Sequence, residues 1–353
     1  MSLTEKTVNE SLKKLIDPNT EKSLIDTKSV ESIDIVDDKP NLKICLGYPA
    51  KNFAETLNHM IIDRLLSDGI SCGTVEITWK IESHSVQKSL QPMKNIKNVI
   101  AVASGKGGVG KSTTAVNIAL ALAGEGSNVG ILDADIYGPS LPKLTGINNK
   151  PKSNGKKIIP HIAFGLQVMS IGYLVPEDAA TIWRGPMVMS AIEQLLRDVN
   201  WSNLDFLIID MPPGTGDAQL TLSQRVQLSG AIIVSTPQDL SLIDARKGLN
   251  MFKKVNVPIL GIIENMSYFE CHNCNTKHEI FGNGGAQAEA KKLGVTFLNA
   301  IPLDISLRTT SDEGTPIVYK EPNSFISKKY MEIGSKILSQ IEKSRKQFPQ
   351  IIQ

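Results

Sequence analysis

The sequence predicts a doubly wound α/β domain with a mostly parallel sheet, preceded by a small α+β unit. Within residues 98–345, short continuous apolar runs are separated mostly by helical segments. Strands that are buried on both faces of a parallel sheet have this composition, because crossover helices cover both faces. The runs are Val99–Ala103, Val129–Leu132, Phe206–Ile209, Gly230–Val234 and Ile259–Ile263.

Residues 1–82 have a different pattern, with short alternating segments separated by turn residues. Their predicted element order is α-β-β-α-β, and the first two strands form a hairpin. The expected elements are a helix over 7–16, strands over 32–36 and 42–46 with the turn 37–41 between them, a helix over 53–66 and a strand over 74–81.

The remaining segments are predicted to connect or close these units. Residues 83–97 are polar, contain a proline and form a linker. The basic, turn-rich insertion at 150–157 is expected to be a solvated loop. A helix over 325–342 carries an apolar stripe, which more often packs on its own domain than on lipid, and 346–353 form a tail. The stripe is Ile326, Tyr330, Ile333, Ile337 and Ile341.

Composition narrows the classes of function. The chain has 353 residues and a net charge of +2, so no global charge favours nucleic acid or a membrane surface as a partner. Four cysteines do not make a disulfide framework and fit a reducing compartment. No leader-like segment and no apolar run of membrane-spanning length is present in the sequence, so we expect a cytoplasmic protein.

A phosphate-binding loop is predicted at GKGGVGKS, residues 105–112, which satisfies the G-x-x-x-x-G-K-[ST] pattern. The required context is present, because a strand precedes the loop and a helix over 113–122 follows it. Glycines let backbone N–H groups converge on phosphate oxygens. Lys111 is expected to neutralise the β- and γ-phosphates, and the Ser112 hydroxyl to ligate Mg²⁺. The predicted nucleotide-binding residues of this loop are Gly105, Lys106, Gly107, Gly108, Val109, Gly110, Lys111, Ser112 and Thr113.

Acidic residues follow two of the predicted strands. Asp133 and Asp135 follow the run that ends at Leu132, and Asp210 follows the run 206–209. Carboxylates at the carboxyl ends of parallel strands face the crevice in which doubly wound folds bind ligands. Asp210 is the candidate that holds Mg²⁺ through water, and the loop 212–216 beside it is expected to act as a γ-phosphate switch. No Asn-Lys-x-Asp guanine-reading motif is present in the sequence, which favours ATP over GTP.

Cys271 and Cys274 form the CxxC of the sequence and supply half of a four-thiolate site. A symmetric dimer would bring two such pairs together and complete a Cys₄ site for an iron–sulfur cluster. Three alternatives remain open from the spacing alone: an intrachain zinc site with His278 and with His272 close by, a redox dithiol, or an inert pair.

The lysines Lys106 and Lys111 in GKGGVGKST resemble the deviant Walker A loop of the MinD/ParA/nitrogenase-iron-protein class. Further stretches narrow the match: ILDADIYGPS (131–140), WRGPM (183–187), DMPPGTGD (210–217), ENMSYF (264–269) with the CxxC, and IPLDISLRTTSDEGTPIV (301–318). Other members of the class generally lack WRGPM and a CxxC at this place. With these stretches nearly the whole chain resembles the Mrp/ApbC family of iron–sulfur cluster carrier ATPases, and residues 1–82 resemble the MIP18-like (DUF59) domain.

The resemblance implies specific roles at matching positions. In the nucleotide site it implies that Lys106 acts on the partner's nucleotide across a dimer, Asp135 orients the attacking water, Asp210 is the Walker B acid, and Gly214 senses the γ-phosphate. It further implies that Asn265 contacts adenine, that Pro302 and Asp304 line the base and ribose, and that Cys271 and Cys274 bind the cluster.

One departure concerns the N-terminal unit. MIP18-like domains often carry a cysteine in a Thr-x-x-x-Cys-Pro segment, whereas residues 46–51 read LGYPAK and contain none. Cys45 and Cys72 are therefore interpreted as packing residues rather than as cluster ligands.

The function implied by the resemblance is that of a homodimeric ATPase, with ATP and Mg²⁺ as cofactors, that carries a [4Fe–4S] cluster. Its partners would be apo iron–sulfur proteins and cluster scaffold proteins, with no nucleic acid and no membrane, and the N-terminal unit would be a docking module. Alternatives are a MinD/ParA-like positioning ATPase, an ATPase with structural zinc at the CxxC, and a metabolic or nitrogenase-like P-loop enzyme.

Overall fold

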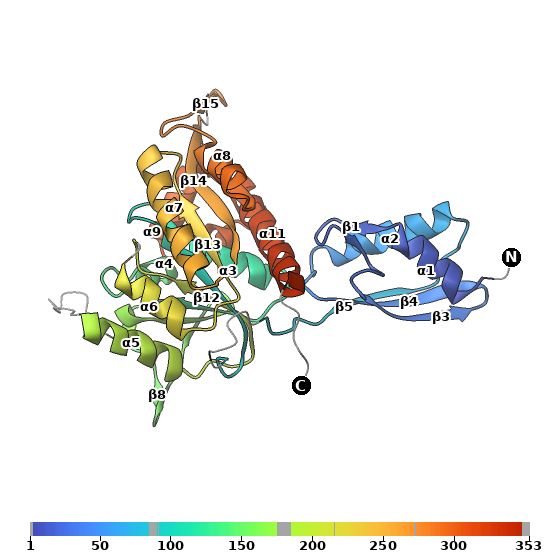
Figure 1. The fold of residues 1–353 in the computed structure, drawn as a ribbon, viewed down its shortest axis with the longest axis horizontal. Helices are drawn as coiled ribbons and strands as arrows, with labels where there is room; N and C mark the ends of the chain where they lie inside the picture. The colour runs from blue at the N-terminus through green and yellow to red at the C-terminus, as the bar shows by residue number, and fades with distance from the viewer. Residues whose placement is uncertain are drawn as a thin grey trace. The chain divides into compact units, whose positions relative to one another are not determined.

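The computed structural model describes residues 3–84, 90, 92–174, 185–214, 216–271 and 273–347. By their contacts these residues fall into two compact units. The smaller comprises 3–82, 124–126 and 338–347, and the larger comprises the described residues from 83 to 123 and from 127 to 337 (Figure 1). Several predictions fall outside the described residues: Thr215, His272, Trp183 and Arg184 of WRGPM, linker residues 85–89 and 91, and 348–353 of the tail.

The smaller unit has the predicted α-β-β-α-β order, with one additional two-residue ladder near its start. Its helix α1 begins two residues earlier than predicted, because the Thr4 hydroxyl accepts a hydrogen bond from the Thr7 backbone and caps it. The hairpin turn at Asp37 and Asp38 has positive φ angles of 51° and 56°. The elements are α1 (Glu5–Lys13), β1 (Ile16–Asp17), β2 (Lys22–Ser23), β3 (Val30–Val36), β4 (Lys39–Leu46), α2 (Ala54–Ser67) and β5 (Val75–Trp79).

The strands β3 and β4 are antiparallel, and β5 runs parallel to β4. One face of this sheet packs on the two helices, where Leu42, Ile44 and Leu57 are at most 1% exposed. Cys45 and Cys72 are half-buried free thiols in this unit, and burial raises the pKa of both. This placement agrees with their interpretation as packing residues.

The larger unit is built on a sheet of nine strands among the described residues, in the order β10-β11-β7-β12-β6-β13-β14, with β15 and β16 both pairing with β14. All pairs are parallel except β10 with β11 and β14 with β15, so the predicted mostly parallel sheet is confirmed. The strands are β6 (Ile96–Ala103), β7 (Val129–Asp133), β10 (His161–Ala163), β11 (Leu166–Ser170), β12 (Leu204–Asp210), β13 (Gly230–Ser235), β14 (Ile259–Glu270), β15 (Lys277–His278) and β16 (Phe297–Leu303).

Helices lie on both faces of this sheet (Figure 1). From β11 to β16 the chain advances across the sheet in one direction, so right-handed crossovers place α5, α6, α7 and α8 on one face, where successive helices contact one another. The connection from β6 to β7 runs the other way and places α3 on the opposite face, where Gly334 of α11 packs closely on Ala121. The helices are α3 (Lys111–Gly124), α4 (Leu141–Thr145), η1 (Ile171–Tyr173), α5 (Gly185–Arg197), α6 (Asp217–Arg225), α7 (Asp239–Lys254), α8 (Gly285–Leu293), α9 (Ile305–Asp312), α10 (Ile317–Lys320) and α11 (Phe325–Gln347).

The apolar stripe of α11 is covered by the protein itself. Ile326, Tyr330, Ile333 and Ile337 are at most 4% exposed, as the sequence predicts for a stripe that packs on its own domain. Among the described residues, none of the helices combines the length and apolar character that a bilayer crossing requires. The insertion at 150–157 is largely exposed and contains the short hairpin of β8 (Ser153–Asn154) and β9 (Lys157–Ile158).

Candidate functional site

The predicted phosphate loop connects the carboxyl end of β6 to the start of α3. Its glycines are required both by backbone conformation and by space. Gly108 and Gly110 have φ angles of +80° and +78°, in the left-handed region that favours glycine. A Cβ atom on Gly105 would lie 2.2 Å from the carbonyl carbon of Asp244, and one on Gly110 would lie 2.2 Å from the amide nitrogen of Asn265. The loop is therefore held in one conformation by its close neighbours.

Lys111 and Asp210 form a buried ion pair at the base of this loop. Because β6 and β12 are paired in parallel, with Asp210 opposite Val102, the carboxyl end of β12 lies beside the loop that leaves β6. The Lys111 ammonium donates to the Asp210 carboxylate and also lies 3.4 Å from the Ser112 hydroxyl oxygen. Lys111 is 6% exposed and Asp210 is fully buried. The pair keeps both charges compensated inside the protein.

The residues expected to hold Mg²⁺ fit that ion. The second carboxylate oxygen of Asp210 is buried and has no hydrogen-bond partner among the described residues. With the Ser112 hydroxyl it offers two oxygen ligands of the kind that Mg²⁺ prefers. When bound, the ion would neutralise charge on the phosphates.

Asp133 is the last residue of β7 and Asp135 lies two residues further on, but the two carboxylates have different surroundings. Burial and, to a smaller extent, the negative charge of Asp210 raise the pKa of Asp133 to about 7. The Asp133 carboxylate accepts from the backbone N–H groups of Asp135, Ser140 and Leu141 and from the Ser170 hydroxyl, at 2.9–3.1 Å. Asp135 instead lines the cavity above the phosphate loop, and burial raises its pKa while Lys111 opposes that rise. Asp133 therefore holds the loop that presents Asp135.

This P-loop cavity has a volume of about 530 Å³. Lys106 lines it, and Pro213 contributes from the loop that was expected to act as the switch. The predicted residues on its wall are Lys106, Gly107, Gly108, Gly110, Lys111, Ser112, Thr113 and Asp135. Sequence reasoning missed Lys143 of α4 and Ser311 and Asp312 of α9, which also line it. These three residues belong to no motif with a recognisable spacing, because they reach the cavity from two separate helices, α4 and α9.

Gly214 and Asn265 also lie next to the phosphate loop without lining the cavity. Gly214 has a φ angle of +92°, and its N–H donates to the Ser104 carbonyl at 3.1 Å. Asn265 is 5% exposed, and its amide nitrogen donates to the Val109 carbonyl at 2.8 Å. Asn265 thus supports the loop from β14, and its amide oxygen is buried without a partner among the described residues. Its predicted contact with adenine stays a prediction.

The CxxC lies on a hairpin at the end of β14. Cys271 follows the strand directly, its N–H donates to the Thr276 carbonyl at 3.0 Å, and β15 pairs back so that Phe269 faces His278. Both thiols are free; Cys271 is half-buried and Cys274 is exposed. Hydrogen bonding with Thr276 lowers the pKa of the Cys274 thiol. Among the described residues, which exclude His272, no group of three possible metal ligands gathers, so His278 does not complete an intrachain zinc site with the two cysteines.

Pro302 and Asp304 lie in a second cavity, of about 270 Å³, which Cys271 also lines and which we call the Cys271 pocket. The Asp304 carboxylate caps α9 by accepting from the N–H groups of Ser306 and Leu307 at 2.7 and 3.1 Å. The beginning of α9 thus borders this pocket, while its last two residues line the P-loop cavity. The sequence does not predict that a cysteine of the CxxC and the loop at 302–304 share one cavity.

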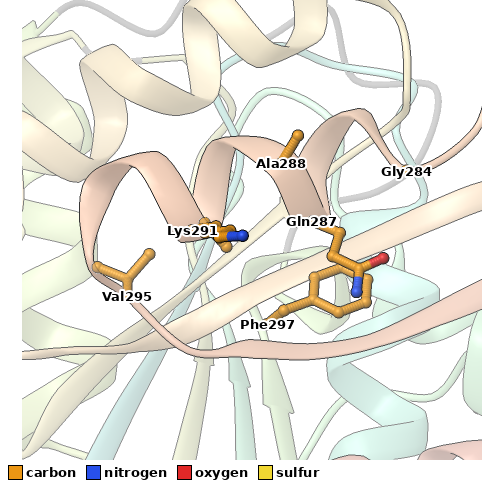
Figure 2. A pocket seen from close by; sticks show the side chains of 7 residues that line it. Gly284, Gln287, Ala288, Lys291, Val295 and Phe297 are labelled. Atoms are coloured by element: carbon orange, nitrogen blue, oxygen red, sulfur yellow. The ribbon is translucent and has the colours of Figure 1, made fainter.

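A third hollow lies along α8 and is lined by Gln287 and Lys291 of that helix and by Phe297 of β16 (Figure 2). None of the predicted site residues lines it. It is separate from the site formed by the P-loop cavity and the Cys271 pocket.

Comparison with known proteins matches both units. Residues 95–338 match the family described as NUBPL iron-transfer P-loop NTPase, and residues 5–77 match that described as iron-sulfur cluster assembly protein. The iron-sulfur cluster carrier protein of Escherichia coli K12 is 45% identical over 332 residues, which cover 92% of this chain and 89% of that protein. The iron-sulfur cluster transfer protein NUBPL of Dictyostelium discoideum is 52% identical over 272 residues, covering 74% of this chain and 84% of that protein.

Solved structures agree with the predicted fold class. A nucleotide-binding protein from Archaeoglobus fulgidus in complex with ADP is 40% identical, with a TM-score of 0.58, and covers 66% of this chain and 93% of its own. The cell division ATPase MinD of Pyrococcus furiosus is 22% identical, with a TM-score of 0.50, and covers 68% of this chain and 98% of its own. At that identity MinD shows a shared fold alone.

Proposed function

The chain belongs to the NUBPL-type iron-transfer P-loop NTPases, and we propose that it is an ATP-hydrolysing carrier that binds an iron–sulfur cluster and delivers it to apo-proteins. One observation carries the proposal: a single compact unit combines a phosphate cavity over the Lys111–Asp210 pair with a hairpin that presents two free thiols. The first feature suits nucleotide hydrolysis, and the second suits reversible binding of a cluster as cargo.

In the nucleotide site, the loop N–H groups and Lys111 bind the phosphates. Ser112 and Asp210 would hold Mg²⁺, which would supply positive charge next to the phosphates and the Asp210 carboxylate. Asp135, on the cavity wall, orients the attacking water, and Gly214 responds to the γ-phosphate. Lys106 also lines the cavity and has no ion-pair partner among the described residues, which leaves it free to reach a partner subunit's nucleotide.

The base of ATP is proposed to lie toward the ends of β14 and β16. Pro302 and Asp304 line a cavity there, and Asn265 has a buried amide oxygen to offer. These three positions were expected to contact base and ribose. Asn265 lies next to the phosphate loop, and Pro302 and Asp304 line the cavity at the start of α9, which supports that direction for the nucleotide.

The cluster is proposed to be a [4Fe–4S] cluster held between two subunits. One hairpin supplies two thiolates, whereas such a cluster takes four, so a two-fold dimer would complete the set. Two nucleotides at the same interface, each approached by Lys106 of the other subunit, would make its geometry depend on the γ-phosphate. Opening or closing the interface would then control release of the cluster.

The domain assignment is part of the proposal. We assign residues 1–82 to a MIP18-like docking module for apo-proteins or scaffold proteins, 83–97 to a linker, 98–345 to the ATPase and 346–353 to a tail. The last two linker residues already belong to β6, and the first two tail residues still belong to α11. The match of residues 5–77 to an iron-sulfur cluster assembly family supports the role of the first segment.

Anaerobic reconstitution with iron and sulfide tests the cluster assignment. The wild-type protein is expected to bind about four irons per dimer with the absorption of an iron–sulfur cluster. Cys271→Ala and Cys274→Ala are each expected to lose it, with Cys45→Ala as the matched control that retains it. Equal iron uptake by all four proteins would contradict the assignment, and a colourless protein that binds only zinc would favour a structural metal instead.

A further inference from the structure

The Cys271 pocket joins one cluster-binding cysteine to the residues proposed to hold the nucleotide base. The strands β14 and β16 are parallel, and Phe269 pairs with Leu303. Cys271 follows the end of β14 and Asp304 follows the end of β16, so both lie at the same edge of the sheet. Cys274, three residues further on, does not line this pocket and is exposed. The two thiols of the CxxC therefore differ in surroundings.

The lining of the pocket suits one planar heterocycle. Apolar walls come from Pro302, Phe325 and Ile326, while Asn275, Ser306 and Glu321 place polar groups around them. The volume of about 270 Å³ lies just below the range of roughly 300–1,000 Å³ that is typical for whole drug-sized ligands, as expected for a cavity that takes part of a larger molecule.

The distance between the Cys271 pocket and the P-loop cavity also suits a single nucleotide that reaches from one to the other. Ser306 lines the Cys271 pocket and Ser311 lines the P-loop cavity, both from α9. At the helical rise per residue, these positions are separated by roughly 8 Å along the helix axis. A nucleotide with its phosphates on the loop can therefore extend along α9 toward the pocket.

We propose that the base of a bound adenine nucleotide occupies the Cys271 pocket and covers the Cys271 thiol, so that nucleotide and cluster compete at this cysteine within one subunit. The inference rests on the proposed nucleotide and cluster sites. Such competition would let the nucleotide control binding of the cluster without any movement of one subunit relative to the other. By thermodynamic reciprocity, a group attached to Cys271 weakens nucleotide binding by the same factor by which the nucleotide disfavours that group.

Alkylation of the reduced, cluster-free full chain by iodoacetamide tests this directly. The variants Cys274→Ala and Cys271→Ala each leave one of the two thiols in the tryptic peptide 255–277, whose modification mass spectrometry follows over time. ADP at ten times its dissociation constant leaves about one pocket in eleven empty, so alkylation of Cys271 is expected to slow about tenfold. Tripolyphosphate, which fills the phosphate cavity without a base, is expected to leave that rate unchanged, and ADP to leave the rate at Cys274 unchanged.

A pocket-filling variant gives an independent measurement. Ser306→Tyr is expected to slow alkylation of Cys271 without any ligand and to weaken ADP binding at least about tenfold, while tripolyphosphate binding stays the same. The matched control is Ile305→Tyr, because Ile305 is 53% exposed and does not line the pocket. In the reverse direction, prior carbamidomethylation of Cys271 is expected to weaken binding of ADP but not of tripolyphosphate.

Two results would overturn the inference. Equal slowing by ADP and tripolyphosphate, or equal slowing at both cysteines, would show that the phosphate site or subunit association covers the hairpin. Unchanged alkylation of Cys271 in the presence of demonstrably bound ADP would show that the base lies elsewhere. Neither result bears on whether the protein takes up a cluster on reconstitution, so the proposed function is tested separately.

Discussion

The phosphate loop and the CxxC hairpin lie in the same unit but are built in opposite ways. The loop is fixed by a buried ion pair, by the Asn265 contact to Val109 and by glycines whose replacement would collide with neighbouring atoms. The hairpin is closed by a two-residue ladder, and its outer thiol is exposed. One region is complete within the chain, whereas the other presents groups for something that the chain does not supply.

Because of this difference, replacements in the two regions should affect the stability of the fold and the function of the protein differently. In the phosphate loop, the groups that would bind ATP also compensate buried charge, so replacing them should destabilise the protein. In the hairpin, replacement should remove ligands without disturbing the core. The following predictions test that contrast by the free energy of unfolding and by ATP hydrolysis.

Lys111→Met is expected to have the largest effect. It leaves the fully buried Asp210 carboxylate unpaired, which should cost about 3–5 kcal/mol of stability, and it should lower ATP hydrolysis by at least about 10²-fold. Chemical denaturation and a phosphate-release assay measure the two effects. The double variant Lys111→Met with Asp210→Asn should regain most of the stability but none of the activity, and Lys152→Met at an exposed position is the control. A double variant as unstable as the single one would show that the ion pair is not the cause.

Gly110→Ala comes next. The residue has a φ angle of +78°, and the added Cβ atom would lie 2.2 Å from the Asn265 amide, so a loss of about 1–3 kcal/mol is expected together with weaker ATP binding. Gly107→Ala is the matched control, because no atom lies within 4 Å of its added Cβ, and it should change stability by less than about 0.5 kcal/mol. Denaturation midpoints compare the two, and equal losses would argue against a rigid loop.

Asn265→Ala is expected to have a smaller effect. It removes the bond to the Val109 carbonyl and should cost about 1 kcal/mol, with a rise in the KM for ATP because the loop loses its support from β14. Asn154→Ala, on the exposed β8–β9 hairpin, should change neither quantity. Steady-state kinetics and denaturation measure both variants. Identical behaviour would mean that Asn265 does not position the loop.

Cys274→Ala should have the smallest effect on the folded state. The thiol is exposed and bonds only within its own turn, so the melting temperature of the cluster-free protein should not change. Differential scanning calorimetry checks this against the wild type. A clear drop in the melting temperature would mean that the hairpin has a structural role that its exposure does not suggest.

Part of this organisation could be predicted from the sequence. The phosphate loop was predictable because its residues are contiguous, and Asp210 because parallel strands bring their carboxyl ends to one edge. The different roles of Asp133 and Asp135 were not, because the chain folds back onto Asp133 through Ser140 and Leu141. The contact between Asn265 and Val109 joins positions 156 residues apart, and no local pattern records it.

The sequence also did not predict that α9 contributes residues to the P-loop cavity. Asp304 was expected near the base, but Ser311 and Asp312 reach the phosphate cavity only because α9 starts at one cavity and ends at the other. The CxxC is evident from its spacing in the sequence, whereas the half-buried position of Cys271 depends on the register between β14 and β16. Local spacing in the sequence identifies the residues of a motif. The packing of the elements decides which cavity each of those residues faces.

The central claim is that nucleotide state controls delivery of the cluster, and a transfer assay tests it most directly. Cluster-loaded protein is mixed anaerobically with an apo-enzyme that requires a [4Fe–4S] cluster, with ATP, with ADP or without nucleotide, and the recovery of enzyme activity is followed. Transfer rates of the wild-type protein should differ at least about fivefold between nucleotide states, and those of a protein carrying Lys111→Met should not. Equal rates for the wild type in all three conditions would contradict the account.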